Sequence, residues 1–190
     1  MARVFVTGGV HGDEPSGALA LQSLRKAGLA CFGPCNPWGL VHGTRALENG
    51  RDLNRSFARL DCPEAATVRD AVCAAQPRLL VDLHEDCRAA LPYFIQFGEG
   101  DIGLRLVAVL RQYEFEPRPG YFVLRGNQGV LQPGRIARGL VGLSRRWPLA
   151  YWFWRSFARA GLVVEAPAAW PLERRVAFHR EVVEMATSLE

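Results

Sequence analysis

A strand, a glycine-rich turn and a helix follow one another directly at the start of this chain. The apolar run Val4-Phe5-Val6 predicts a buried strand, and the apolar spacing of residues 16–27 predicts a helix. Between them stands the turn Gly8-Gly9-Val10-His11-Gly12-Asp13-Glu14. Its glycines allow the chain to fold back, so we expect the imidazole of His11 and the carboxylate of Glu14 to point at one spot.

The remainder of the chain alternates apolar runs with amphipathic segments. We expect strands at 29–35, 78–84, 91–97 and 162–165, and helices at 63–75, 101–113, 149–160 and 171–188. Residues 38–57 predict a long ordered loop, and residues 117–147 a second loop region with one strand at 121–124. This alternation predicts an α/β protein: a three-layer α/β/α sandwich with a mixed, mostly parallel central sheet, formed as one domain by residues 1–190.

Composition narrows the classes of protein that fit. A hydrophobic fraction of 49% and a charged fraction of 22% are those of an ordinary globular protein. The sequence has no apolar leader and no membrane-spanning run, and its five cysteines form no CxxC pair, so we expect a cytoplasmic protein with free thiols and no membrane partner. The net charge of +4 is scattered along the chain, which argues against nucleic acid as a partner.

Three side chains suggest a metal site. A catalytic zinc takes His and Glu as protein ligands and keeps its fourth position open, so His11 and Glu14 supply two ligands of a His/Glu/His set. The run Val81-Asp82-Leu83-His84 offers the third ligand, His84, at the end of another strand. Ligands of α/β sheets bind outside the carboxyl ends of the strands, where His11, His84 and also Glu165 are expected.

Further motifs occur in order along the chain: Asn36-Pro-Trp-Gly, Thr44-Arg45, Asp52-Leu-Asn-Arg-Ser-Phe and Asp82-Leu-His84. Together with the first turn, this series resembles the succinylglutamate desuccinylase/aspartoacylase family of the zinc carboxypeptidase superfamily. The resemblance runs from residue 4 to about residue 97 and resumes at Leu162-Val-Val-Glu165-Ala-Pro. It implies a zinc carboxypeptidase-like fold.

The resemblance also implies one Zn²⁺ per chain, with His11, Glu14 and His84 as its ligands. Asp52 matches the carboxylate that orients the first histidine ligand. That role is physically reasonable, because a metal-bound histidine normally donates its second N–H to a carboxylate or a carbonyl.

Catalytic and substrate-binding roles follow from the same resemblance. Glu165 matches the general base that activates water, and Arg45 matches the arginine that polarises the scissile carbonyl. Asn54 and Arg55 match the pair that holds the free carboxylate of the substrate. An arginine fork beside an amide suits bidentate capture of a carboxylate.

These matches predict a zinc hydrolase that cleaves an amide bond next to a free carboxylate, with a small peptide or an acylated amino acid as substrate. The alternative within this class is a deacylase of N-acyl acidic amino acids. Longer relatives carry a β-rich carboxyl-terminal cap, whereas this chain ends after one closing helix. We therefore favour the carboxypeptidase-like activity, and we expect the parts that select the acyl or amino-acid side chain to be missing or replaced by residues 113–147.

Other interpretations of the same residues remain open. His11 and Glu14 fit a surface pair beside a helix dipole, and Gly8-Gly9 before a helix fits a nucleotide-binding turn, although Glu14 would repel phosphate. A zinc-binding interaction module without activity is a third possibility. The aromatic segment 151–154 predicts core, with a homo-oligomer interface as the alternative.

Overall fold

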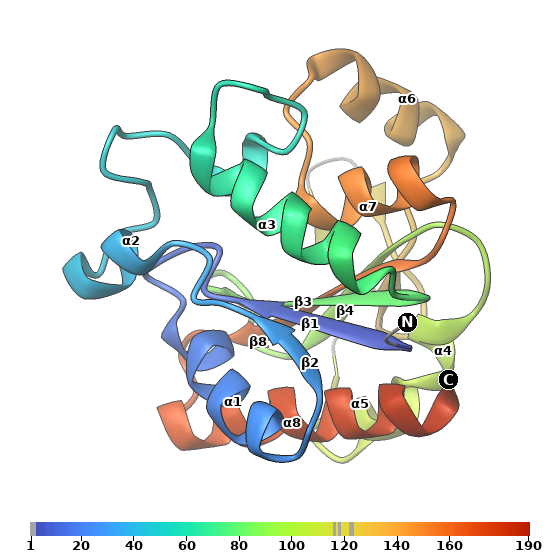
Figure 1. Cartoon of the computed structure of the whole chain (residues 1–190). Helices are drawn as coiled ribbons and strands as arrows, with labels where there is room; N and C mark the ends of the chain where they lie inside the picture. Colours follow the sequence, from blue (N-terminus) through green and yellow to red (C-terminus); the bar gives the residue numbers. More distant parts are fainter. Residues whose placement is uncertain (1–2, 116, 118, 122–123) are drawn as a thin grey trace.

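A six-stranded sheet forms the centre of the molecule, which is described here from a computed structural model covering residues 3–115, 117, 119–121 and 124–190 (Figure 1). Its strands, in spatial order, are β2 (Ala30–Phe32), β1 (Val4–Gly8), β3 (Leu79–Asp86), β8 (Gly161–Pro167), β4 (Tyr93–Phe97) and β7 (Val130–Leu131). Only the β4–β8 pair is antiparallel among the pairs of this sheet. The expected mixed, mostly parallel sheet is therefore confirmed.

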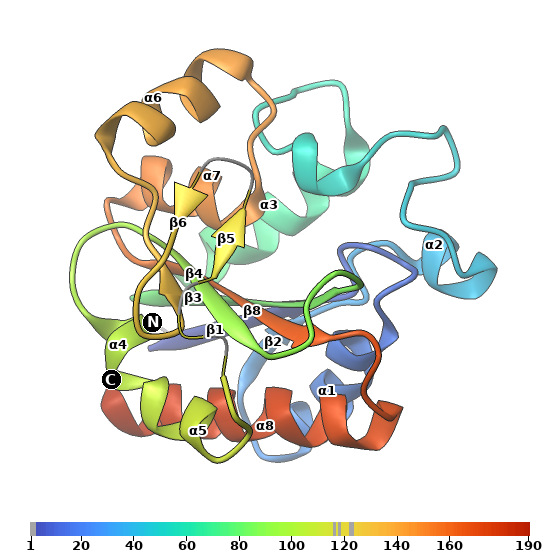
Figure 2. The same ribbon diagram turned by 180° about the vertical axis from the view of Figure 1, so that it is seen from behind.

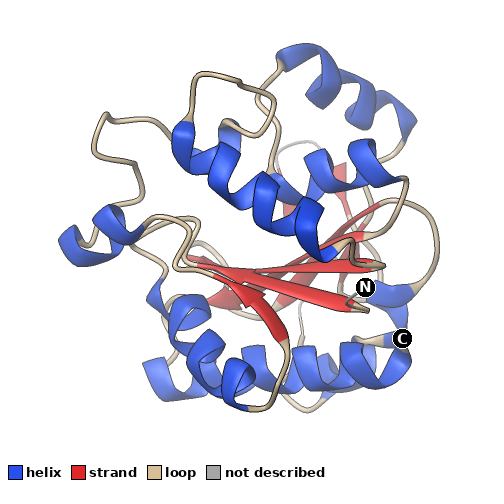
Figure 3. Cartoon of the chain, in the orientation of Figure 1, coloured by secondary structure: helices blue, strands red, loops and turns tan. Residues whose placement is uncertain are grey.

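Helices cover both faces of this sheet (Figure 3). One layer contains α1 (Pro15–Lys26), α5 (Val107–Arg111) and α8 (Leu172–Leu189), and the opposite layer contains α3 (Pro63–Ala75) and α7 (Leu149–Phe157). The shorter elements are α2 (Pro37–His42), a 3₁₀ helix (Leu53–Arg55), α4 (Ile102–Arg105) and α6 (Arg135–Ser144), and the small pair of strands is β5 (Gly120–Tyr121) with β6 (Leu124–Arg125). This arrangement confirms the three-layer α/β/α sandwich. No helix in the described part of the chain combines the length and the apolarity that crossing a membrane requires.

The alternation of side chains along β3 decides which face carries the polar groups. Leu79, Val81 and Leu83 pack into the core cluster that also contains residues of α1 and α8. Leu80 points to the other face and packs with residues of α3 and α7. Because successive side chains of a strand alternate between faces, Asp82 and His84 continue the row of Leu80. The polar end of β3 therefore lies on the α3/α7 side.

Close packing fixes the turn that carries His11. A Cβ atom on Gly12 would lie 1.9 Å from the backbone carbon of Gly39 in α2, and Gly9 has a positive φ of 68°. Larger residues at these two positions would force the turn away from α2 or strain its backbone. The glycines thus hold the turn that carries His11 tightly against a neighbouring segment.

The local predictions failed mainly in two regions. The segment 117–147 was expected to be a loop, but it contains α6 and β7; the expected strand at 121–124 includes residues 122–123, which lie outside the described residues. α6 was missed because Gly139 and Gly142 interrupt its helical composition. The expected loop at 38–57 includes most of α2 and the 3₁₀ helix.

Candidate metal centre

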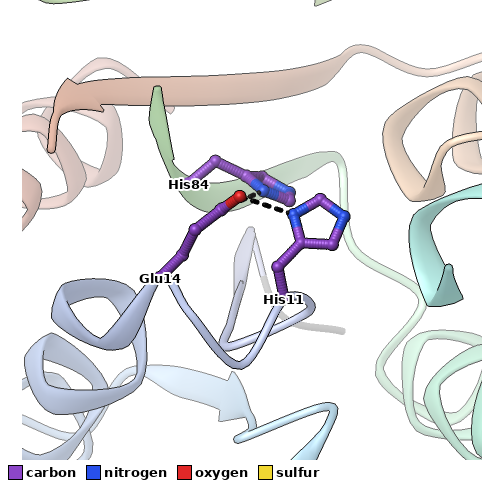
Figure 4. A group of neighbouring side chains, drawn as sticks. All are labelled: His11, Glu14 and His84. Atoms are coloured by element: carbon purple, nitrogen blue, oxygen red, sulfur yellow. Dashed lines mark hydrogen bonds and ion pairs between the residues drawn. The ribbon is translucent and has the colours of Figure 1, made fainter. Parts of the chain in front are cut away.

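The side chains of His11, Glu14 and His84 meet at the carboxyl end of the parallel strands (Figure 4). Nδ1 of His11 lies 2.7 Å from Oε1 of Glu14, and Nδ1 of His84 lies 2.8 Å from Oε2 of the same carboxylate. One ligand atom from each of the three residues lies within 4.8 Å of the others. All three side chains are buried, with at most 7% of any residue exposed.

The far nitrogen of each imidazole contacts an aspartate. Nε2 of His11 lies 3.2 Å from Oδ1 of Asp52, and Nε2 of His84 lies 2.8 Å from Oδ2 of Asp82. Asp82 also accepts a 2.7 Å hydrogen bond from the hydroxyl of Thr7 on β1. The aspartate at Nε2 therefore orients each imidazole ring so that Nδ1 points at Glu14.

The charges of the cluster stabilise one another. Burial disfavours the ionised carboxylate of Glu14, but the neighbouring His84 and His11 hold its pKa well below the ordinary value. Burial likewise disfavours protonated His84, yet the charges of Asp82 and Glu14 raise its pKa well above the usual value. Burial by itself would raise the pKa of Asp52. The hydrogen bond from His11 and the positive charge of His11 outweigh this effect, so the pKa of Asp52 is lowered.

This donor set fits zinc. Two imidazole nitrogens and one carboxylate oxygen are the ligands of a three-residue catalytic zinc site, and the aspartates behind the rings supply the orienting hydrogen bonds that such ligands normally have. A metal ion would replace the protons that His11 and His84 share with Glu14, because metal binding requires neutral imidazoles.

Arg45 reaches the cluster from the loop that follows α2. Its Nη1 atom lies 3.1 Å from Oε1 of Glu14, and its Nε atom lies 3.3 Å from Oδ2 of Asp52. The side chain nevertheless keeps 46% of its surface exposed. Arg45 therefore links the buried carboxylate of Glu14 and the partly buried carboxylate of Asp52 to the solvent side of the centre.

Glu165 lies beside His84 across two neighbouring strands. The two residues are register partners in the parallel pair β3–β8, and Tyr93 of β4 is the partner of Glu165 on its other side. Register partners project to the same face of a sheet, so these three side chains form a row. Glu165 keeps part of its surface exposed, yet burial of the carboxyl group raises its pKa to about 7, with the charges of Glu14 and Asp86 adding to the effect.

Asn54 and Arg55 occupy the 3₁₀ helix that follows Asp52. Oδ1 of Asn54 accepts a 3.0 Å hydrogen bond from the backbone N–H of Leu149, the first residue of α7. Nη1 of Arg55 donates to the backbone oxygen of Asn54 at 2.8 Å, and its charge acts on Asp52. Arg55 thus lies near Asp52, whereas the oxygen of Asn54 anchors a helix.

A second set of buried polar contacts supports the candidate ligand Glu14 and was not predicted. The backbone N–H of Glu85 donates to Oε2 of Glu14 at 3.1 Å, and the side chain of Glu85 accepts from the backbone N–H of Ser16 at 2.7 Å. From α8, Arg175 pairs with Glu85, and Nε2 of His179 lies 3.1 Å from Oγ of Ser16. These contacts thereby connect the helix α8 to the turn that carries Glu14.

Residues near the centre differ in burial. His179 is fully buried, whereas Cys87 is exposed. Asp82 was overlooked, although its place two residues before His84 puts both side chains on one face of a strand. In contrast, Tyr151, Trp152 and Phe153 are buried, as the aromatic segment predicted.

No protein-family model matches the sequence, and no curated protein matches it either. Solved structures do match. A protein of Shewanella baltica OS155 that is assigned as a metallopeptidase aligns over 100% of this chain and 76% of its own, with a TM-score of 0.80 and 18% identity. A metallo-carboxypeptidase from Burkholderia cenocepacia aligns over 99% of this chain and 57% of its own, with a TM-score of 0.71 and 21% identity. The chain has the metallo-carboxypeptidase fold.

The cell shape determinant protein Csd4 from Helicobacter pylori, with product bound, shares this fold as well. It aligns over 99% of this chain and 50% of its own, with a TM-score of 0.72 and 16% identity. The chain therefore spans between half and about three quarters of the length of these three structures. At identities below 25%, the likeness establishes the fold, and the activity has to be argued from the residues.

Proposed function

We propose that this chain is a zinc-dependent hydrolase that cleaves an amide bond next to a free carboxylate, in the manner of a carboxypeptidase, with residues 1–190 as one catalytic domain. The observation that supports this most is the placement of Glu14 between the Nδ1 atoms of His11 and His84, at 2.7 and 2.8 Å. Zinc held by these residues would supply a Lewis acid for the carbonyl and would acidify water.

Glu165 is the proposed general base. It accepts the proton of the attacking water and passes it to the leaving nitrogen, which becomes an amine. A base works best when its pKa lies near the working pH, and the pKa of Glu165 is raised to about 7. Its register pairing with His84, a proposed ligand, supports a role for the carboxylate beside the metal rather than on it.

Arg45 is proposed to stabilise the charge that develops on the carbonyl oxygen. Its guanidinium contacts Glu14 and Asp52 and remains half-exposed, so it lies between the ligand cluster and solvent. A preorganised donor at a developing oxyanion typically contributes about 3–4 kcal/mol to the lowering of the barrier.

The carboxylate of the substrate is proposed to bind Asn54 and Arg55. Because Oδ1 of Asn54 accepts the N–H of Leu149, the NH₂ group of Asn54 is the part that donates to a ligand. Arg55 is partly exposed on the same 3₁₀ helix and adds positive charge near Asp52. This pair favours a substrate that ends in a free carboxylate over one that ends in an amide.

Zinc uptake and turnover test the proposal together. Metal-free protein should bind one zinc per chain, and the zinc-loaded protein should cleave dipeptides faster than the same dipeptides with a carboxyl-terminal amide. Preferential cleavage of N-acyl acidic amino acids would instead identify a deacylase of the aspartoacylase type. Zinc binding without turnover of either class would identify a binding module, and a protein that takes up no zinc near neutral pH would refute the proposal.

A further inference from the structure

Helix α6 turns its apolar side toward solvent. Ile136, Leu140 and Leu143 follow one another at helical spacing and expose 83%, 63% and 82% of their surfaces. They are three of the seven exposed large apolar side chains among the described residues. The opposite side of the helix, which includes Val141, packs against the cluster around Tyr151. Figures 1 and 2 show α6 beyond α7, on the side away from the central sheet.

Positive charge surrounds this apolar row. Arg135 begins the helix, and Arg145 and Arg146 follow its last residue; all three are exposed, and no carboxylate of the described residues pairs with them. Residues 117–164 contain eight arginines and no aspartate, glutamate or lysine, whereas the whole chain carries a net charge of only +4. The rest of the chain is therefore net acidic, so the expectation of scattered charge was wrong: the basic charge is concentrated in this segment.

Although the sequence predicted no membrane partner, we propose that α6 docks the protein on an anionic lipid surface. Ile136, Leu140 and Leu143 enter the boundary between headgroups and acyl chains, and the arginines at both ends of the helix bind lipid phosphates. A helix with apolar side chains on one side and basic residues at its borders is typical of such interfacial contacts. Ten residues extend about 15 Å, half of a hydrocarbon core, so the helix lies on the bilayer and does not span it.

Charge and shape favour lipid over the other possible occupants. A second copy of the chain would bring two sets of arginines together, and like charges across an interface are repulsive. A protein partner would need a groove that matches the protruding helix and acidic groups placed at both of its ends. An anionic membrane offers negative charge at every point of a deformable surface and needs no such match.

Flotation of the protein with vesicles tests the proposal. The full chain should bind vesicles of phosphatidylcholine mixed with phosphatidylglycerol and should not bind vesicles of phosphatidylcholine alone. Replacing Arg145 and Arg146 by glutamine should lower the partition coefficient by about five-fold for each arginine. Combining I136S, L140S and L143S should lower it by about ten-fold or more, because the apolar contact is lost.

Matched controls lie elsewhere on the surface. Leu60→Ser removes an apolar side chain that is 95% exposed, and Arg111→Gln removes an exposed arginine at the end of α5; neither should change vesicle binding. Equal binding to both kinds of vesicle, or unchanged binding of the triple serine variant, would refute the proposal.

Absence of binding to either kind of vesicle would also refute it. Sedimentation velocity then distinguishes the remaining occupants. A concentration-dependent dimer that the triple serine variant loses would assign the helix to a second copy of the chain, and a persistent monomer would assign it to an acidic protein partner.

Discussion

The Nε2 atom of His84 lies 2.8 Å from Oδ2 of Asp82, which precedes it by two residues on the same strand. The strand itself sets this geometry, because residues i and i+2 share one face. Asp82 receives a second hydrogen bond from Thr7 on the neighbouring strand, so its carboxylate is fixed from two sides. The candidate ligand His84 is thus oriented by the rigid centre of the sheet.

Asp82→Asn tests whether this orientation matters for the metal. We expect zinc affinity to fall about 10- to 100-fold, because the amide no longer offers His84 the charged acceptor that fixes its ring. Competition with a chromophoric chelator measures the affinity. Asp61→Asn, which changes an exposed aspartate in a surface ion pair, is the matched control and should leave the affinity unchanged. An Asp82→Asn variant with wild-type affinity would show that the contact is dispensable.

Glu165→Gln separates catalysis from metal binding. The amide keeps the size of the side chain but cannot accept the proton of water, so turnover should fall roughly 10²- to 10⁴-fold. Zinc content and melting temperature should stay near those of the wild type, whereas His84→Ala should lose zinc because it removes a ligand. If Glu165→Gln retained full activity, or lost its metal, another group would have to be the base.

Burial of His179 makes the stability of the fold sensitive to acid. Burial lowers the pKa of His179 to about 3. The positive charges of His84 and Arg175 also lower this pKa, whereas the negative charge of Glu14 opposes the shift. The unfolded chain, with a histidine pKa near 6.5, binds the proton more readily. This contribution to stability is therefore complete above about pH 6.5 and is lost as the pH falls toward 3, by about 1.4 kcal/mol per pH unit.

His179→Gln removes this titration and leaves an amide able to donate to Ser16. We expect the urea unfolding free energy of the variant to depend less steeply on pH between about 6 and 4 than that of the wild type. His42→Gln changes an exposed histidine and should reproduce the wild-type slope. Parallel pH profiles for the wild type and His179→Gln would show that His179 does not carry the effect.

Arg175 is only partly exposed and pairs with the buried Glu85, so breaking one side of this pair should be costly. Arg175→Met leaves the carboxylate of Glu85 buried without its cationic partner, which should reduce the unfolding free energy by about 3–5 kcal/mol. Adding Glu85→Gln to the Arg175→Met variant should recover much of the lost unfolding free energy. Arg180→Met breaks the exposed pair with Glu184 and should cost less than about 1 kcal/mol. Equal losses for the two arginine variants would contradict the importance of burial.

Local sequence was sufficient for most of the elements and for three candidate ligands. The turn between β1 and α1 was predictable because glycines, a short apolar strand and a helical pattern adjoin one another, and these features determine where His11 and Glu14 stand. His84 was predictable at the end of β3 for the same reason. Backbone preference and side-chain alternation act over a few residues, and a sequence displays them directly.

Only the tertiary structure decided the contacts that cross the molecule. Ser16 meets His179 across 163 positions of the chain, and Asn54 meets the start of α7 across 95. The orientation of α6, with Leu140 outward, likewise depends on which side of the helix packs against α7. Such contacts arise when whole helices pack on a sheet, and nothing in the local chain distinguishes a buried histidine of α8 from an exposed one. Preferences for helix, strand and turn depend on residues that are neighbours in the sequence, whereas burial depends on how the helices pack on the sheet.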